Sequence, residues 1–270
     1  MDDRPIGVFD SGLGGLTTVR ELCRLLPEED IVYFGDTGRV PYGSRSRETI
    51  VKYARQDVAF LRTFDLKTIV IACGTVSTTA LDVLAAENPI PVLGVVAPAA
   101  RAAARATRSG SIGLIGTQAS IRSGAYERLI RAENPAARVL AQPCPLFVPL
   151  VENGRFRPGD VVIETVAAEY LAPLKAAGVD TLVLGCTHYP LLEEVIGACM
   201  GPEVRLINSG AEGARAAADC LRERDALAGP GRGSCRCFVS DRQEDFSRLA
   251  STFLGWDVAQ AVEQVDISQY

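Results

Sequence analysis

The chain has 270 residues, a formal net charge of −5 at pH 7 and 47% hydrophobic residues, enough for one large core or two of ordinary size. This acidic balance offers no basic surface for nucleic acid, and no apolar run reaches the roughly 18 residues of a membrane span. The opening "MDDRPIGVFD" leads directly into a strand pattern and does not resemble a signal peptide. We therefore expect a cytoplasmic protein whose eight cysteines are reduced thiols.

Short apolar runs recur along the chain and alternate with amphipathic stretches of helical period. The runs that predict strands are Ile6–Phe9, Ile31–Phe34, Ile69–Ala72, Val92–Val96, Ile112–Ile115, Val139–Ala141, Leu182–Leu184, Val204–Ile207 and Cys237–Val239. The clearest helical stretches are Leu16–Leu26, Arg47–Phe64, Val161–Ala177 and Glu212–Arg224. Continuous apolar strands that alternate with helices are typical of parallel sheets covered on both faces. The pattern therefore predicts a doubly wound α/β fold.

The sequence also contains an internal repeat. "KTIVIAC" aligns with "DTLVLGC" without a gap, and "IGVFDSG" resembles "IGLIGTQAS". Each half thus begins with a strand that ends in a small hydroxyl-bearing loop and later offers a strand that ends in cysteine. Chance similarity between buried strands is the alternative. We expect two similar lobes, 1–98 with 209–270 and 99–208, with the active site in the cleft between them.

Reactive side chains follow several of the predicted strands, where ligands of open parallel sheets bind. They are Asp10-Ser11, Cys73-Gly74-Thr75, Thr117 and Cys186-Thr187-His188. Cys73 and Cys186 also precede predicted helices, whose free N–H groups bind carboxylates and lower the pKa of a thiol. A single cysteine at a strand end is usually a small buried side chain, which is how we interpret the other six. The equivalent places of these two in the repeat make them candidate acid–base groups.

Two thiols on opposite walls of one cleft can invert a stereocentre. One thiolate removes a proton from one face of a carbon atom, and the other thiol returns a proton to the opposite face. N–H groups at helix ends would stabilise the negative charge that develops next to a carboxylate. A nucleophilic Cys186 with His188 as its base is the alternative, and this pair would give acyl transfer.

Cofactor and metal sites are not expected. "DSGLGGL" fails as a dinucleotide-binding motif because Thr17 stands where the third glycine belongs, and the chain has no P-loop sequence. We expect this glycine-rich loop to allow close backbone approach to a small ligand. No lysine follows a predicted strand, which disfavours a Schiff base with pyridoxal phosphate. The Cys235–Cys237 pair has no second ligand cluster for zinc.

Three stretches, "IGVFDSGLGGLTTVREL", "IVYFGDTGRVPYGSRS" and "LGCTHYPLL", closely resemble motifs of the glutamate racemases, within the cofactor-independent aspartate/glutamate racemase family. The resemblance extends over essentially the whole chain. It implies a two-lobed α/β enzyme that interconverts the enantiomers of glutamate by a two-thiol mechanism without a cofactor. It further implies that the product, D-glutamate, supplies peptidoglycan synthesis in the cytoplasm, and that the protein can form a homodimer.

Carried over residue by residue, the resemblance implies that Cys73 and Cys186 are the two acid–base thiols. Asp10 would assist the first and His188 the second, with Glu152 of "PLVENGRF" supporting the histidine. The substrate contacts that it implies are Asp10, Ser11, Pro41, Tyr42, Gly43, Gly74, Thr75, Thr117, Ser120, Thr187 and His188. Without the resemblance, Asp10 is equally well a helix cap, Glu152 a solvated charge and Tyr42 a packing aromatic residue.

Gly38, Gly74 and Asn208 depart from the family pattern, and the departure at Gly74 has the clearest consequence. The first cysteine is usually followed by asparagine, and here it is followed by Gly74. The missing side chain normally binds the substrate, and losing one hydrogen bond to a charged ligand costs about 1.5–3 kcal/mol if nothing compensates. A racemase for another acidic or related amino acid therefore stays an alternative, as does a non-catalytic protein that binds an amino acid.

Overall fold

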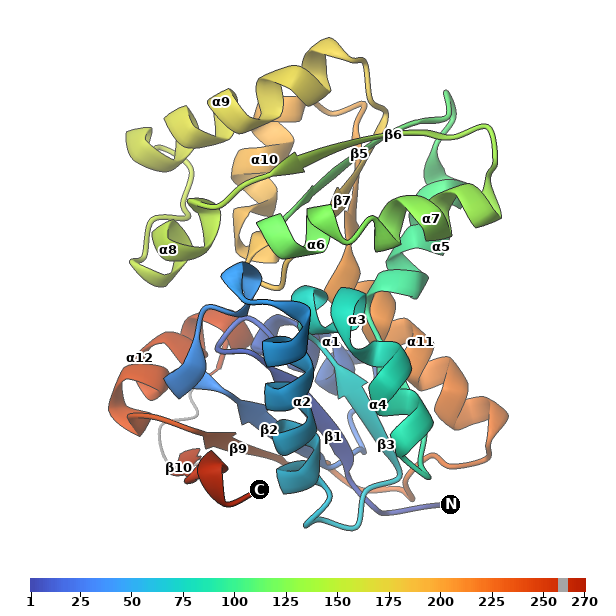
Figure 1. The fold of residues 1–270 in the computed structure, drawn as a ribbon, viewed down its shortest axis with the longest axis vertical. Helices are drawn as coiled ribbons and strands as arrows, with labels where there is room; N and C mark the ends of the chain where they lie inside the picture. Colours follow the sequence, from blue (N-terminus) through green and yellow to red (C-terminus); the bar gives the residue numbers. More distant parts are fainter. Residues whose placement is uncertain (257–261) are drawn as a thin grey trace.

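The computed structural model of the protein describes residues 1–256 and 262–270. Its strands form two parallel sheets, of six and four strands, and helices cover both faces of each sheet (Figure 1). This arrangement confirms the predicted α/β fold with two doubly wound lobes. No helix within the described residues is both long and apolar enough to cross a membrane.

The larger sheet lies between two layers of helices. Across the sheet its strands are β10 (Val262–Gln264), β9 (Cys235–Val239), β2 (Ile31–Gly35), β1 (Ile6–Asp10), β3 (Thr68–Ile71) and β4 (Val92–Gly94). One face is covered by α1 (Leu16–Leu25), α11 (Ser209–Glu223) and α12 (Gln243–Leu254). The other face is covered by α2 (Arg47–Leu61), α3 (Gly74–Thr79) and α4 (Leu81–Glu87).

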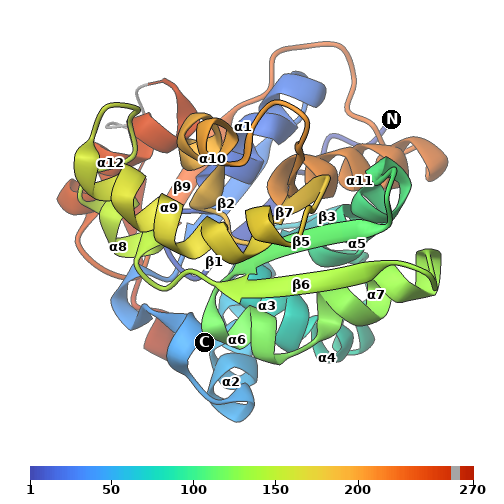
Figure 2. The ribbon, with the colours of Figure 1, turned by 90° about the horizontal axis from the view of Figure 1, so that it is seen from above.

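The smaller sheet is built in the same way, as Figure 2 shows from above. Across it the strands are β6 (Arg138–Pro143), β5 (Ser111–Gly116), β7 (Thr181–Leu184) and β8 (Arg205–Asn208). Helices α5 (Val96–Ala106) and α7 (Ala125–Glu133) cover one face, and α8 (Phe147–Glu152), α9 (Val161–Ala176) and α10 (Glu193–Met200) cover the other. The short helix α6 (Gln118–Arg122) follows β5 and contacts α3 of the larger lobe.

The two sheets share one strand order, which gives the sequence repeat a structural meaning. The order β2-β1-β3-β4 within the larger sheet matches β6-β5-β7-β8 in the smaller one. Strands β1, β3 and β7 are buried at every position, which explains their continuous apolar runs. Cys73 follows β3 and Cys186 follows β7, so the two cysteines leave equivalent strands.

The chain passes from the larger sheet to the smaller through α5 and returns through α11. The prediction of one strand over Val92–Val96 is wrong at its end, because β4 stops at Gly94 and α5 begins at Val96. Pro98 lies in the first turn of that helix, where a missing N–H costs nothing, and the alanines that follow favour helix. Among the described residues, every strand of the larger sheet lies in 1–98 or 209–270, and every strand of the smaller in 99–208.

Candidate active site

A cavity of about 400 Å³ lies between the carboxyl ends of the two sheets, and both Cys73 and Cys186 line it. A volume of this size suits a small-molecule ligand. The other predicted residues that line it are Ser11, Pro41, Tyr42, Gly43, Gly74, Thr75, Thr117, Glu152, Thr187 and His188. Asp10 and Ser120 are each 1% exposed and are not part of the lining. The roles of these two residues as substrate contacts stay predictions.

Cys73 stands at the junction of β3 and α3, with its sulfur turned toward the loop that follows β1. Its Sγ donates a hydrogen bond to the Ser11 hydroxyl over 3.3 Å, and its side chain is buried. Burial and the charge of Asp10 raise the pKa of the Cys73 thiol to about 12, although hydrogen bonding with Ser11 and with backbone N–H groups opposes this shift. The sequence-based expectation of a lowered thiol pKa is therefore wrong for Cys73, because desolvation outweighs the helix terminus.

Cys186 has different surroundings from Cys73, although the two leave equivalent strands. Its sulfur lies 3.9 Å from Nδ1 of His188, and Nε2 of the same ring lies 2.9 Å from a carboxylate oxygen of Glu152. Glu152 reaches the ring from the end of α8, 36 residues away along the chain. The three side chains therefore form a continuous chain of polar contacts at the wall that belongs to the smaller sheet.

His188 holds its proton in this chain of contacts. Burial alone would lower the pKa of His188, but hydrogen bonds and charge interactions with Cys186 and Glu152 raise it to about 10. The protonated ring places a positive charge beside the Cys186 sulfur. Because this pKa is raised, the contribution of His188 to the free energy of unfolding is complete below pH 6.5 and is lost as the pH rises through about 10.

The titration of His188 can be measured directly, because it is the one histidine in the chain. We expect its imidazole NMR signals to keep their protonated shifts at pH 8 and to move only near pH 10. In a Glu152→Gln variant the ring loses a negative neighbour, so its midpoint should fall. A midpoint near the ordinary value of about 6.5 in the unaltered protein would contradict the proposed contacts.

The loop after β1 is pressed against the loop after β7, and Asp10 lies at this junction. The Thr187 hydroxyl donates to Asp10 Oδ1 over 3.4 Å, and the Gly12 N–H donates to Oδ2 over 2.9 Å. The Thr17 hydroxyl donates to the Thr187 carbonyl over 2.9 Å, which gives a role to the residue that breaks the glycine motif. Burial raises the pKa of Asp10, and the charge of His188 opposes this shift.

Gly14 makes this junction possible. A Cβ atom at Gly14 would lie 2.1 Å from the Thr187 hydroxyl oxygen and 2.6 Å from Nδ1 of His188. The glycine-rich loop was expected to approach a ligand, and at Gly14 the structure instead shows close approach to the other lobe. Glycine is required there because any side chain would separate the two loops.

Hydroxyl groups from both lobes meet on another side of the cavity. The Oγ1 atoms of Thr75 and Thr117 are 3.1 Å apart, and Thr117 donates to Ser120 Oγ over 3.0 Å. Ser120 therefore lies behind Thr117 and orients it. Tyr42 is among the lining residues, but its hydroxyl contacts the buried carboxyl groups of Asp36 and Asp57. A role for the Tyr42 hydroxyl in holding substrate is thereby disfavoured.

Gly74, where the family pattern has asparagine, has a close backbone neighbour. A Cβ atom there would lie 2.7 Å from the Gly185 carbonyl oxygen of the opposite lobe. Backbone contacts this close force a shift, so the two lobes can take up their observed separation because residue 74 has no side chain.

Part of the lining was missed by the sequence patterns. Cys144, Pro145, Val148 and Pro149 line the cavity after β6, and they make one of its walls apolar. The position of this stretch after a strand could have indicated its role. β6 is a parallel strand, and its carboxyl end lies at the same sheet edge as those of β5 and β7. The stretch was overlooked because Cys144 was interpreted as a small buried side chain and the prolines and valine near it carry no reactive group.

Glu152 and His188 are the only charged side chains in the lining that the described residues form. No arginine or lysine lines the cavity; Lys67, for example, is buried against Glu29, and Lys175 binds the Cys199 carbonyl. Carboxylates would therefore be held by hydroxyl and backbone N–H groups. Within residues 1–256 and 262–270, no group of three or more histidine, cysteine, aspartate or glutamate side chains could hold a metal ion.

The sequence model of the Asp/Glu/hydantoin racemase family matches residues 9–217, a range that includes both cysteines. The chain belongs to this family. It is 49% identical over 256 residues to a glutamate racemase of Geobacter metallireducens, and the match covers 94% of each chain. As a member of the Asp/Glu/hydantoin racemase family, the protein is expected to act on the α-carbon of an amino acid or a related compound.

Solved racemase structures are similar to this fold over nearly its whole length. The glutamate racemase isoform RacE1 of Bacillus anthracis superposes with a TM-score of 0.93 at 38% identity, and the match covers 98% of each chain. The glutamate racemase of Francisella tularensis, solved in complex with D-glutamate, gives 0.92 at 38% identity and covers 100% of each chain. The two-lobed arrangement is thus shared with glutamate racemases.

Proposed function

We propose that this protein is a glutamate racemase that interconverts L- and D-glutamate with two cysteines as acid and base and without a cofactor. The observation that carries the proposal is that Cys73 and Cys186, from equivalent strands of two lobes, line one cavity. The name of the Geobacter metallireducens relative and the D-glutamate bound by the Francisella tularensis protein support glutamate as the substrate.

The reaction needs one proton to leave the α-carbon and one to return. A thiolate on one wall takes the α-proton, and the electron pair of that C–H bond passes into the carboxylate as an enolate. The thiol on the opposite wall then gives its proton to the other face of the carbon atom, and the negative charge ends on its sulfur. Oriented N–H and hydroxyl groups around the carboxylate lower the energy of the enolate.

Cys73 begins this reaction as a thiol. In the ligand-free cavity the raised pKa of about 12 keeps Cys73 protonated, so Cys73 is ready to act as the acid. When Cys73 acts as the base, another group must first accept its proton. Asp10 is the buried carboxyl group whose charge raises the pKa of Cys73. On the other wall, the protonated His188 stabilises negative charge on the Cys186 sulfur, and Glu152 orients the ring.

Substrate recognition rests on neutral donors. Ser11, Thr75, Thr117 and Thr187 bring hydroxyl groups to the lining, and Gly43 and Gly74 bring backbone N–H groups. Glutamate carries two carboxylates that can share these donors. The alternative substrate, another acidic amino acid, is favoured by one observation, which is Gly74 in place of asparagine. We further infer a cytoplasmic homodimer whose D-glutamate supplies peptidoglycan synthesis.

Circular dichroism tests the proposal most simply. Purified protein incubated with either enantiomer of glutamate should bring the optical signal to zero, and solvent deuterium should appear at the α-carbon. Aspartate treated in parallel should exchange much more slowly. Deuterium uptake into aspartate alone would replace glutamate as the substrate, and tight glutamate binding without exchange would indicate an amino acid sensor. A covalent acyl adduct at Cys186 would indicate a Cys–His hydrolase.

A further inference from the structure

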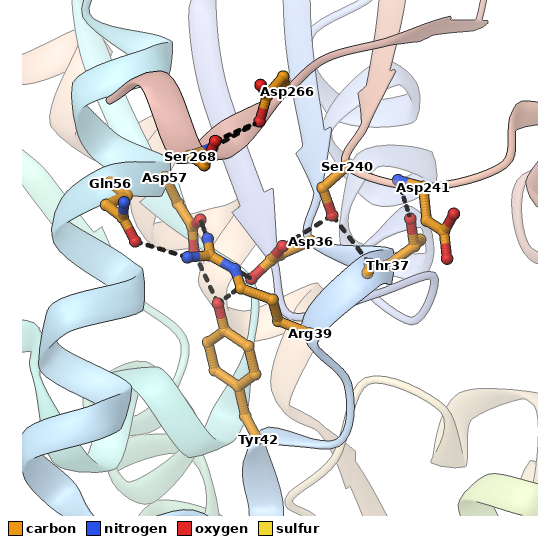
Figure 3. A network of polar contacts seen from close by, with 11 residues as sticks. Asp36, Thr37, Arg39, Tyr42, Gln56, Asp57, Ser240, Asp241, Asp266 and Ser268 are labelled. Atoms are coloured by element: carbon orange, nitrogen blue, oxygen red, sulfur yellow. Dashed lines mark hydrogen bonds and ion pairs between the residues drawn. The ribbon is translucent and has the colours of Figure 1, made fainter.

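A buried cluster of polar side chains lies between the end of β2 and α2 (Figure 3). The loop that joins these two elements lines the cavity with residues 40–44. We define this anchor cluster as Asp36, Arg39, Tyr42 and Asp57. Both carboxyl side chains are completely buried, and the Arg39 side chain is 17% exposed. The cluster joins the end of β2 to α2 across the intervening loop. So much polar burial outside the catalytic chemistry requires an explanation.

Asp36 accepts hydrogen bonds on both of its oxygens. Oδ2 accepts from Arg39 Nε over 2.7 Å and from the Tyr42 hydroxyl. Oδ1 accepts from the Ser240 hydroxyl over 2.7 Å, and the same Ser240 oxygen accepts from the Gly38 N–H over 2.8 Å. Asp36 thus ties the loop to the end of β9, and every one of its contacts requires an acceptor.

Asp57 contacts the same two partners in a different way. Its Oδ1 accepts from Arg39 over 2.7 Å, and its Oδ2 lies 3.1 Å from the Tyr42 hydroxyl oxygen. Tyrosine has a single hydroxyl proton, which it gives to Asp36. The contact with Asp57 is therefore a hydrogen bond only if Asp57 supplies the proton.

The count of charges also indicates that one carboxyl group of the cluster carries a proton. One guanidinium faces two buried carboxyl groups, and Gln56, which also accepts from Arg39, is neutral. The cluster is neutral only if one carboxyl group carries a proton, and an unbalanced buried charge is costly. Burial and the charge of Asp36 raise the pKa of Asp57 well above its ordinary value, which agrees with the geometry.

The position of the cluster indicates what it does. Val40 and Pro41 lie between Arg39 and Tyr42 in the sequence. All residues from Val40 to Ser44 line the cavity. We propose that the anchor cluster positions this wall, residues 40–44, for substrate, and that Asp57 serves in it as a neutral carboxylic acid. The proposal rests on the proposed racemase function and assigns Asp36, Arg39 and Asp57 as positioning residues, with no contact to the reacting atoms.

Two isosteric substitutions test the proposal because it predicts opposite results. In Asp57→Asn the amide oxygen still accepts from Arg39 and the amide N–H donates to Tyr42, so KM and kcat should stay within about threefold. In Asp36→Asn an N–H group faces donors, and Asp57 must give up its proton to balance the charge of Arg39. The KM for glutamate should then rise at least tenfold, with a smaller change in kcat, because the wall moves while the thiols remain.

A measurement without substrate separates this proposal from the proposed function. Hydrogen–deuterium exchange of the amides of residues 37–45 should become faster in Asp36→Asn and stay unchanged in Asp57→Asn. If the unaltered protein does not racemise glutamate, the proposed function fails, while the exchange contrast still tests the anchor. If Asp36→Asn does not fold, Tyr42→Phe replaces it, with the same increase in KM and in exchange expected. Similar behaviour of the two asparagine variants, or a Tyr42→Phe protein with unaltered KM and exchange, would overturn the proposal.

Discussion

Replacing either Cys73 or Cys186 with serine is expected to lower the rate of glutamate racemisation by on the order of 10³-fold or more. An alcohol is far less acidic than a thiol, so serine neither forms the base at neutral pH nor gives up a proton readily in the transition state. Each substitution removes one of the two groups that act on opposite faces of the α-carbon. Circular dichroism of reactions started from each enantiomer measures the loss in both directions.

The matched control is Cys199→Ser, because Cys199 is half-buried and does not line the cavity. This variant should racemise glutamate at the rate of the unaltered protein. Solvent deuterium uptake into each enantiomer adds a second reading, since a variant that keeps one working base still exchanges the enantiomer on which that base acts. Full racemisation by either catalytic variant would exclude the two-base assignment.

Gly14→Ala should be nearly as damaging, although residue 14 does not line the cavity. The added methyl group would lie 2.1 Å from the Thr187 hydroxyl oxygen and 2.6 Å from the His188 ring nitrogen. The loops after β1 and β7 must then separate, and a displacement near 1 Å at a catalytic site costs about 100-fold in rate. We expect a fall of about that size in kcat/KM and a loss of about 1–3 kcal/mol in the free energy of unfolding.

Gly231→Ala is the matched control for this substitution. A Cβ atom at Gly231 meets no other atom within 4 Å, so the same chemical change there should alter neither activity nor stability. Thermal unfolding measures the stability of both variants, and initial rates at several glutamate concentrations separate kcat from KM. An active Gly14→Ala enzyme with an unaltered His188 NMR signal would show that the two loops need not touch.

The repeat explains why the site has two thiols, while the surroundings of each thiol explain why the two are not equivalent. Cys73 contacts Ser11, and the charge of Asp10 raises the pKa of the Cys73 thiol. Cys186 instead contacts His188, which is fixed by Glu152. A duplicated strand and turn thus supply the same reactive atom on both walls, and different side chains surround that atom on each wall.

Much of the fold was predictable because buried parallel strands and amphipathic helices have local signatures. The helices predicted at Leu16–Leu26 and Val161–Ala177 differ by one residue at their ends from α1 and α9. The short strand β10 was missed, since Val262 is half-buried, the next two residues are exposed, and the three form no apolar run. The boundary between β4 and α5 was missed because apolar residues continue across it.

Some features of the site could likewise be predicted from the sequence, and others could not. Cys73 and Cys186 follow apolar strands in repeated sequences, so the sequence alone identified them as a pair. The family resemblance predicted that Glu152 supports His188. The 2.9 Å contact between the two side chains exists only because α8 is folded against the loop after β7. The pKa of Cys73 was wrongly anticipated from its helix, because burial depends on atoms from distant segments.

By itself the sequence determined the parallel α/β lobes, their repetition and the chemical identity of the groups at the strand ends. These properties follow from residue type and spacing along one chain segment. The tertiary structure alone decided that Gly14 and Gly74 are points of contact between lobes, that the Tyr42 hydroxyl turns away from the cavity, and that a proton belongs in the anchor cluster. Each of these depends on distances between segments far apart in sequence, and desolvation and close packing are set by such distances.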